Sequence, residues 1–427
     1  MSPLLFSLYV SNIGHDIAMS RVGFKIGNVW INGLMFADDL VLLASSASGL
    51  RALLKKVKDG FDELELSINP AKSQIISPEN AESWEFFNSE GEKVLSLKRT
   101  ALYKYLGTWT YDSMYKTAKE KVKQCIQKAE NYRDKCKYVS KFGPDRVDVI
   151  ECTWLNVALP TILSGTEMIP FLDSEIEIIE RIQSQVCKFA LGVHISSPNI
   201  CSQSEMGMKY FRQYLYEHQL KFYFRVLGLP SSRWVHQAMM DHLSGEWMSP
   251  YFKYICDIRT RLGIISVPLQ KIPKSFGSEY FLNIANEQLA LSGRSDGISS
   301  FKRQPYVRDC TFATTIAQFK LGSEYLGNKT PRTGYTIKVF CPLCPTVQLN
   351  CGSHLLLHCS SISSLRKQCG VQTFINGCKI LRNLSDDEIY KLFINGYDVS
   401  GNPITVFEYL HRGKILFDLR EKWLSCW

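Results

Sequence analysis

Two adjacent aspartates stand in a short segment with the order Phe36–Ala37–Asp38–Asp39, between two apolar runs. Burying both acids without a cation would cost free energy. A hairpin tip at the edge of a cleft can instead hold both carboxylates where divalent ions keep them charged. Nucleotidyl transfer requires this arrangement, because one Mg²⁺ activates the attacking 3′-hydroxyl and a second neutralises the leaving pyrophosphate. Taken alone, the four residues also fit an ordinary turn, in which aspartate is common.

A second candidate site lies among the cysteines, of which the chain has 14, seven of them from Cys341 onward. The run Cys341–Pro342–Leu343–Cys344 is followed by His354, His358 and Cys359. A Cys-x-x-Cys turn donates two thiolates, and a histidine on a following helix, with another ligand one turn later, completes a tetrahedron around zinc. His354 and His358 are expected to share a helical face, so the fourth ligand stays open between His358 and Cys359, with Cys351 a weaker choice. Four protein ligands indicate a structural metal, and the alternative is a small helical hairpin of unligated thiols.

The composition is that of a globular chain, with 45% hydrophobic and 21% charged residues. No apolar stretch is long enough to span a bilayer, and the N-terminus lacks the basic start and cleavage site of a secretory signal. Clustered cysteines in such a chain favour a metal over a disulfide. We therefore expect a reducing, intracellular compartment without membrane association, with nucleus and cytoplasm both open.

The net charge of +9 is unevenly distributed, because nine Lys or Arg face three Asp or Glu between Lys116 and Lys141. Apolar residues recur there at helical spacing and predict one long helix over 114–141, with lysines on its other faces. A local excess of this size favours a polyanion, most simply a phosphate backbone. A solvated amphipathic helix is the alternative interpretation.

The first 112 residues carry the elements that would position the aspartate pair. In chain order, the pattern first predicts a helix over 3–13, strands over 24–31 and 34–43, and a helix over 50–66 capped by Ser46 or Ser48. A turn at Asn69–Pro70, a short strand over 73–76 and a variable polar stretch follow. The last element is a strand with a glycine in it over 105–110. The aspartates split the second strand. Its end, Val41 to Leu43, lacks alternation, as in a strand buried on both faces. These elements make an α+β unit.

The remainder of the chain is predicted to be mostly helical. Helices are expected over 114–141, 144–165, 173–191, 204–228, 249–263, 278–291 and 406–423. A break rich in Gly, Pro and Thr, from Gly322 to Gly334, precedes the cysteine-rich segment. We therefore expect three domains, an α+β domain over 1–112, a helical domain over 113–330 and a metal-bearing domain over 331–427.

Four stretches resemble, in this order, the palm of reverse transcriptases from non-LTR (LINE-type) retrotransposons. They are Ser2–Tyr9, Phe36–Asp39, Asn69–Ser73 and Tyr105–Gly107. In that family they correspond to the end of a helix, the metal-binding hairpin, a lysine-bearing loop and the strand that grips the primer end. The resemblance implies an RNA-directed DNA polymerase of α+β fold, with RNA template and DNA primer or target as partners. Its partial palm, an antiparallel sheet plus helices, would be followed by a helical thumb and connector and by a small zinc knuckle.

The resemblance assigns roles by position within the palm. Asp38 would be a ligand of Mg²⁺, and Asp39 a less central one, because adjacent side chains diverge along a strand. Lys72 would protonate the leaving pyrophosphate or steady its charge, although a solvated loop lysine is equally open. Phe36 would pack within the palm.

The resemblance also assigns roles beyond the palm. The thumb helix would contact phosphates through four lysines, Lys116, Lys119, Lys123 and Lys128. The family's knuckle is Cys-Cys-His-Cys, which implies a structural Zn²⁺ on Cys341, Cys344, His354 and Cys359, with His358 as the alternate ligand. Such knuckles commonly bind nucleic acid.

One part of the family pattern is missing from this sequence. The family's polymerases use a further aspartate on a strand ahead of the helix that ends at Tyr9, whereas the acid preceding Asp38 here is Asp16, which follows that helix. We therefore expect a weak Mg²⁺ site and a chain that is catalytically incomplete by itself. The alternative functions are a non-enzymatic RNA- and DNA-binding protein and a retroelement remnant.

Overall fold

A computed structural model covers the whole chain. It describes residues 3–26, 29–77, 83–87, 93–111, 113–141, 146–244, 249–263, 281, 283, 286–287, 301–308, 310–321, 344 and 351–425. The described residues form two compact units, each assembled from three stretches of chain. The first unit contains Met1–Cys125, Leu163–Leu172 and Leu215–Phe276, and the second contains Ile126–Ile162, Asp173–Tyr214 and Gly277–Trp427. Small sheets with many helices confirm the α+β class.

The first unit begins with two short helices, α1 (Pro3–Tyr9) and α2 (Ser11–Ala18). The single helix predicted over 3–13 is wrong, because Val10 takes φ −94° and ψ 11° and interrupts it. The strand predicted over 24–31 is also two elements, β1 (Phe24–Ile26) and β2 (Val29–Ile31), which pair antiparallel. The residues between them in the sequence are Gly and Asn, a pair that two-residue hairpin loops favour.

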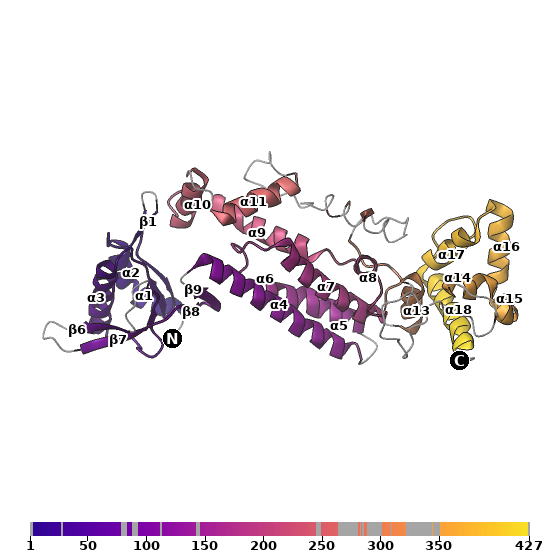
Figure 1. Ribbon diagram of the computed structural model, residues 1–427, viewed down its shortest axis with the longest axis horizontal. Helices are drawn as coiled ribbons and strands as arrows, with labels where there is room; N and C mark the ends of the chain where they lie inside the picture. Colours follow the sequence, from indigo (N-terminus) through magenta and orange to yellow (C-terminus); the bar gives the residue numbers. More distant parts are fainter. Residues whose placement is uncertain are drawn as a thin grey trace. The chain divides into compact units, whose positions relative to one another are not determined.

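The aspartate segment forms the predicted hairpin, with β3 (Gly33–Phe36) antiparallel to β4 (Asp39–Leu42). The residues Val41 to Leu43 are half-buried rather than buried on both faces of the strand. The reason is that β3 and β4 form a sheet of two strands with one side covered. Helix α3 (Ala47–Glu63) starts where Ser46 Oγ accepts the Gly49 N–H at 3.1 Å, so Ser46 is the cap. Helices α2 and α3 pack together against β3 and β4 around a small core, Ile13, Ile17 and Val57 (Figure 1).

The stretch expected to be variable and polar contains two strands, β6 (Ser83–Phe87) and β7 (Lys93–Arg99). They pair antiparallel, and β5 (Gln74–Ile75) joins β7 in parallel. Trp84, Leu95 and Leu97 bury their side chains against α3, which explains the strands. Charged residues between these apolar positions hid the alternation of a half-covered sheet.

The strand predicted over 105–110 is instead a hairpin of β8 (Leu102–Tyr105) and β9 (Thr108–Tyr111). Leu106 and Gly107 connect the strands with φ values of 45° and 80°. A two-residue hairpin turn needs positive φ at both central positions, and glycine adopts it without strain. The glycine therefore marks the turn rather than a strand interior.

Helices follow from residue 114 onward. They are α4 (Met114–Val139), α5 (Arg146–Cys152), α6 (Leu159–Leu163), α7 (Asp173–Leu191), α8 (Asn199–Met206), α9 (Phe211–Leu227), α10 (Trp234–Ser244), α11 (Pro250–Arg261) and α13 (Thr311–Lys320). The helix predicted over 204–228 is broken, because Gly207 ends α8 in the left-handed region at φ 66°. The helix predicted over 278–291 and the break from Gly322 to Gly334 lie largely or wholly outside the described residues.

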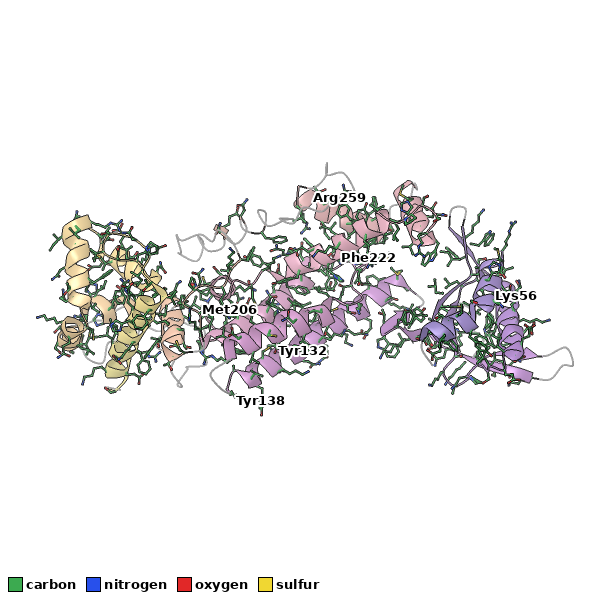
Figure 2. The ribbon with its side chains drawn as sticks, turned by 180° about the vertical axis from the view of Figure 1, so that it is seen from behind. Lys56, Tyr132, Tyr138, Met206, Phe222 and Arg259 are labelled. Atoms are coloured by element: carbon green, nitrogen blue, oxygen red, sulfur yellow. The ribbon has the colours of Figure 1, made fainter. Side chains whose placement is uncertain are left out.

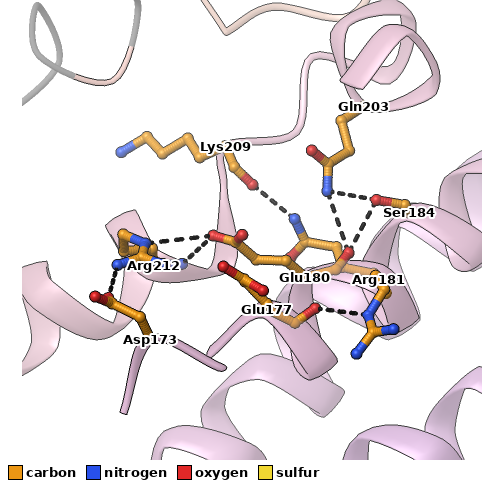
Figure 3. A network of polar contacts seen from close by, with 9 residues as sticks. Asp173, Glu177, Glu180, Arg181, Ser184, Gln203, Lys209 and Arg212 are labelled. Carbon is orange, nitrogen blue, oxygen red and sulfur yellow. Dashed lines mark hydrogen bonds and ion pairs between the residues drawn. The ribbon is translucent and has the colours of Figure 1, made fainter. Parts of the chain in front are cut away.

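Polar side chains connect the helices of the second unit (Figure 3). The Arg212 guanidinium pairs with Asp173, and its backbone N–H donates to Glu180 Oε1 at 3.2 Å. Burial raises the pKa of Glu180, and the positive charge of the nearby Arg212 opposes that rise. Gln203 Nε2 donates to Ser184 Oγ at 2.9 Å. These contacts join α7 to α8 and to the start of α9.

The second unit ends in a helical cluster. Its elements are α14 (Cys351–Ser353), a π-helical turn (His354–His358), a short 3₁₀ turn (Ser360–Ile362), α15 (Ser363–Gln368), α16 (Val371–Arg382), α17 (Asp386–Asn395) and α18 (Val406–Leu424). The predicted helix over 406–423 is confirmed by α18. Leu356, Ile389 and Leu419 lie in one buried core, and α13 packs along α18. Within the described residues, no helix is long and apolar enough to cross a bilayer.

Candidate metal sites and nucleic-acid interface

The aspartate pair lies at the exposed tip of the β3–β4 hairpin. Asp38 stands in the turn, and Asp39 begins β4 opposite Phe36. Ala37 has a φ of 50°, which is unusual for a residue with a side chain and turns the chain sharply before the carboxylates. Phe36 is 63% exposed, so its expected packing within the palm is not observed. Both carboxylates are open to solvent and can accept hydrated Mg²⁺.

The fold brings another of the palm-like stretches near this tip. Burial, and next the charge of Asp39, raises the pKa of Tyr105 at the end of β8. The Asn69 side chain accepts the Ala71 N–H at 3.0 Å and forms the predicted turn, after which Lys72 is exposed. Among the described residues, no third acid, histidine or cysteine joins Asp38 and Asp39 as a compact metal-binding group.

Asn32 organises the base of the hairpin, and the sequence pattern did not single it out. Its side chain is buried, accepts the Gly23 N–H at 2.9 Å, and donates to the Ile17 carbonyl at 2.7 Å and to the Ser20 carbonyl. These bonds join the end of α2 to the start of β1 directly beside β3. The one clue in the sequence is a polar residue placed between two apolar runs.

Helix α4 separates the four predicted phosphate-binding lysines into two kinds. Lys116, Lys119 and Lys123 are exposed. Lys128 is half-buried, and its Nζ donates to the Thr161 carbonyl at 3.0 Å. The first three side chains are therefore accessible at the surface. Lys128 holds α4 to the α5–α6 helical segment.

The exposed lysines continue a stripe along α4. Further positions on the same face are exposed, at Gln127, Asn131, Asp134 and Tyr138. Tyr138 is 63% exposed and projects from the far end of the helix (Figure 2). The opposite face carries Val122, Cys125, Ala129 and Cys136, all buried. The face open to solvent thus carries lysines in its first turns, two amides and Asp134 further along, and Tyr138 near its end.

Three of the predicted zinc ligands come together in the second unit. One side-chain ligand atom each from Cys344, His354 and Cys359 lies within 4.8 Å of the others. The two Sγ atoms are 3.5 Å apart, close to the separation of about 3.8 Å for two thiolates on a tetrahedral zinc. Cys341 and the side chain of Cys351 lie outside the described residues.

The His354 ring supplies an independent test of fit. It is 3% exposed, and neither ring nitrogen has a hydrogen-bond partner among the described residues. Buried polar atoms without a partner are rare because each costs free energy, and a metal ion bound at the site is one recognised explanation. A zinc ion would engage one of the two nitrogens. The donor set therefore fits the metal.

The π-helical turn separates the two histidines that were expected to share a face. The Cys359 N–H donates to the His354 carbonyl at 2.8 Å, a bond that spans five residues and widens the turn. His354 faces the core as a result, whereas His358 is exposed with its Nε2 3.4 Å from Asp386. Cys359, which is buried, lies beside Cys344 in place of His358.

Electrostatics at the cluster favour thiolates. Burial alone would raise the pKa of the Cys344 thiol, but hydrogen bonds with Ser360 and Cys359 outweigh it and lower the pKa to about 6. Arg366 is 4% exposed and donates to the Leu355 carbonyl at 3.4 Å. Burial lowers the pKa of Arg366, and the charges of Cys359 and Cys344 oppose that shift. Its guanidinium would offset the net negative charge of three thiolates on one Zn²⁺. Its position shortly after Cys359 was the available clue.

Residues 1–130 match the family model described as reverse transcriptase (RNA-dependent DNA polymerase). This part of the chain is therefore a nucleic-acid polymerase segment. Two similar proteins are the Retrovirus-related Pol polyprotein from type-2 retrotransposable element R2DM of Drosophila melanogaster, 35% identical over 115 residues, and that from type-1 retrotransposable element R2 of Nasonia vitripennis, 31% identical over 115 residues. Each alignment covers 25% of this chain and 11% of the relative. The chain carries a reverse transcriptase segment of a non-LTR retrotransposon, and the resemblance of the four stretches within residues 2–107 is confirmed.

Proposed function

We propose that this chain holds the template–primer duplex in the reverse transcriptase of a non-LTR element, with α4 as its principal contact to the phosphate backbone. The observation that carries the proposal is the stripe on α4, where Lys116, Lys119 and Lys123 are exposed immediately after the palm-like β8–β9 hairpin. Phosphate contacts of this kind position a duplex without reading its sequence. Binding should therefore be indifferent to sequence and sensitive to salt.

In the proposed mechanism the β3–β4 hairpin contributes Asp38 and Asp39 to a Mg²⁺ site. The ion, when bound, supplies charge neutralisation at the reacting phosphate. Asp38 would be the central ligand and Asp39 its neighbour, while Lys72 would act on the leaving pyrophosphate. The two exposed carboxylates hold Mg²⁺ weakly by themselves, because the ion must keep several waters and gains only two anionic groups. Efficient chemistry then requires a further carboxylate beside the pair.

The Cys344, His354 and Cys359 cluster is proposed to hold a structural zinc with Cys341 as fourth ligand. Two protein ligands on one helical segment, His354 and Cys359, and a cysteine pair ahead of it would close a small fold. Its buried neighbours Leu355 and Leu356 belong to the core of the C-terminal cluster. The zinc would therefore stabilise the C-terminal helices and present their surface to nucleic acid.

A second candidate function is a non-enzymatic RNA- and DNA-binding protein. It is favoured by the exposure of both carboxylates without a compact third ligand among the described residues. Both functions use the α4 stripe, and they differ in whether nucleotide is incorporated.

One experiment tests the shared part. Binding of the purified chain to an RNA–DNA hybrid duplex is measured at several salt concentrations, for the wild type and for Lys116→Gln, Lys119→Gln and Lys123→Gln combined. The triple variant is expected to bind more weakly and with a shallower dependence of log K on log salt. Unchanged binding would place the nucleic-acid surface elsewhere. Nucleotide incorporation by the wild type then separates the two candidates.

A further inference from the structure

The β8–β9 hairpin carries an aromatic and a cationic side chain on one face. Trp109 is 37% exposed, and Lys104 Nζ lies 5.8 Å from the centroid of its ring. The two residues are direct cross-strand partners, so their side chains project to the same side of the hairpin. A lysine at this distance from an indole makes a cation–π contact, which is weak at an exposed site.

The other face of the hairpin is turned toward the protein. Tyr105 and Thr108 are cross-strand partners and both are half-buried. A Cβ at Gly165 would meet Thr108 Oγ1 at 3.2 Å, so this part of the chain lies against the hairpin. Burial, and next the charge of Asp39, raises the pKa of Tyr105. Side chains alternate along a strand, so Lys104 and Trp109 lie on the opposite face, and both are exposed.

The β8–β9 hairpin leads along the chain into the start of α4 (Figure 1). The Tyr111 N–H donates to Thr117 Oγ1 at 2.9 Å, which holds the end of β9 to the first turn of the helix. Tyr115, 75% exposed, stands in that turn beside the exposed Lys116. Two aromatic side chains, each with a lysine nearby, are thus presented close to the proposed duplex-binding stripe.

We propose that Trp109 and Lys104 bind an unpaired nucleotide, with the indole stacking on the base and the ammonium contacting a phosphate. Every base has a π-face, whereas a paired base inside a duplex exposes none, so stacking selects unpaired nucleotides without reading sequence. Charge complementarity supports this ligand, because an aromatic platform with adjacent cations matches a strand of bases and phosphates. The chain then distinguishes unpaired nucleotides from paired duplex. This inference rests on the proposed function only in taking nucleic acid as the ligand.

The test compares binding of a single-stranded oligonucleotide of about 12 nucleotides, as RNA and as DNA, with a blunt duplex of the same length at one salt concentration. Trp109→Ala is expected to weaken single-strand binding about 10-fold and leave duplex binding unchanged. Trp109→Phe, which keeps a stacking ring, should stay within about 3-fold of wild type. Trp234→Ala is the matched control, because Trp234 is 43% exposed on α10.

Intrinsic fluorescence gives a second readout that does not depend on the alanine variant folding. Single-stranded oligonucleotide should quench wild-type fluorescence, and Trp109→Phe should lose that quenching while Trp234→Phe retains it. Equal quenching by Trp109→Phe and wild type, or a parallel loss of single-strand and duplex binding in Trp109→Ala, would overturn the inference. If the wild type binds neither ligand, the proposed function itself fails.

Discussion

The Sγ atoms of Cys344 and Cys359 lie 3.5 Å apart beside a buried His354. This relationship predicts about one zinc per chain. Cys344→Ser, His354→Ala, Cys359→Ser and Cys341→Ser should each lower the zinc content measured by elemental analysis of dialysed protein.

Two matched controls make the zinc prediction specific. His358→Ala should retain the metal, because His358 is exposed and lies 3.4 Å from Asp386 rather than in the cluster. Cys369→Ser should also retain it, because Cys369 belongs to the same core but not to the ligand group. Full zinc retention in both Cys344→Ser and His354→Ala would show that these two residues are not zinc ligands and would contradict the prediction.

Asn32→Ala is expected to destabilise the first unit by about 3 kcal/mol. The substitution leaves the Gly23 N–H and the carbonyls it bonded without partners in a buried position, where Asn32 itself is 2% exposed. Urea unfolding followed by tryptophan fluorescence measures the change. Asn131→Ala, at an exposed position of α4, serves as the control and should stay within about 0.5 kcal/mol. An equal effect of both variants would contradict the role of Asn32.

Glu167 gives a prediction about pH. The His218 ring, whose Nε2 lies 3.2 Å from Glu167 Oε1, holds the pKa of Glu167 below its usual range. A carboxyl whose pKa is depressed by folding contributes stability above its ordinary pKa and loses it as pH falls through the folded value. Glu167→Gln should therefore be less stable than wild type at neutral pH, by under about 1 kcal/mol because both groups are partly exposed. The difference in the free energy of unfolding between the two proteins should shrink in acid. If urea unfolding gives the same difference at neutral and at acidic pH, the contact between Glu167 and His218 is not responsible.

Primer extension tests the catalytic part. The chain alone is expected to show no extension of a DNA primer on an RNA template with Mg²⁺ or Mn²⁺, because two carboxylates at an exposed tip hold the ion weakly. Extension above background that Asp38→Asn abolishes would refute this expectation and assign catalysis to the hairpin. Extension that survives Asp38→Asn would point to a contaminating polymerase.

Local patterns in the sequence predicted the split at Asp38 and Asp39, a cap at either Ser46 or Ser48, and helices such as α7 and α18. They failed where a turn lies inside an apolar run, as at Leu106–Gly107, because periodicity alone does not separate one strand from a hairpin. They also failed where packing decides which side of a helix is covered. Lys128 is a lysine of the same helix, five residues after Lys123, and only the fold shows the Thr161 carbonyl that gives it a structural contact.

The same limit applies to the candidate sites. Cys344, His354 and Cys359 were identified from their types and spacing, and the fold brings them together. The choice of ligand between His358 and Cys359 depended on the π-helical turn, which the regular helical period does not predict. Asn32 and Arg366 carry no motif, because their importance comes from burial among partners that are distant in the sequence.

The central claim, that the exposed face of α4 holds a nucleic-acid backbone, is tested most directly by the slope of log K against log salt for an RNA–DNA hybrid duplex. Lys116→Gln, Lys119→Gln and Lys123→Gln should each reduce the magnitude of that slope by roughly 0.7 to 0.9. Lys128→Gln, whose ammonium donates to the Thr161 carbonyl at 3.0 Å, should leave the slope unchanged. If all four variants keep the slope of the wild type, the claim is contradicted. It is also contradicted if the slope changes only with Lys128→Gln.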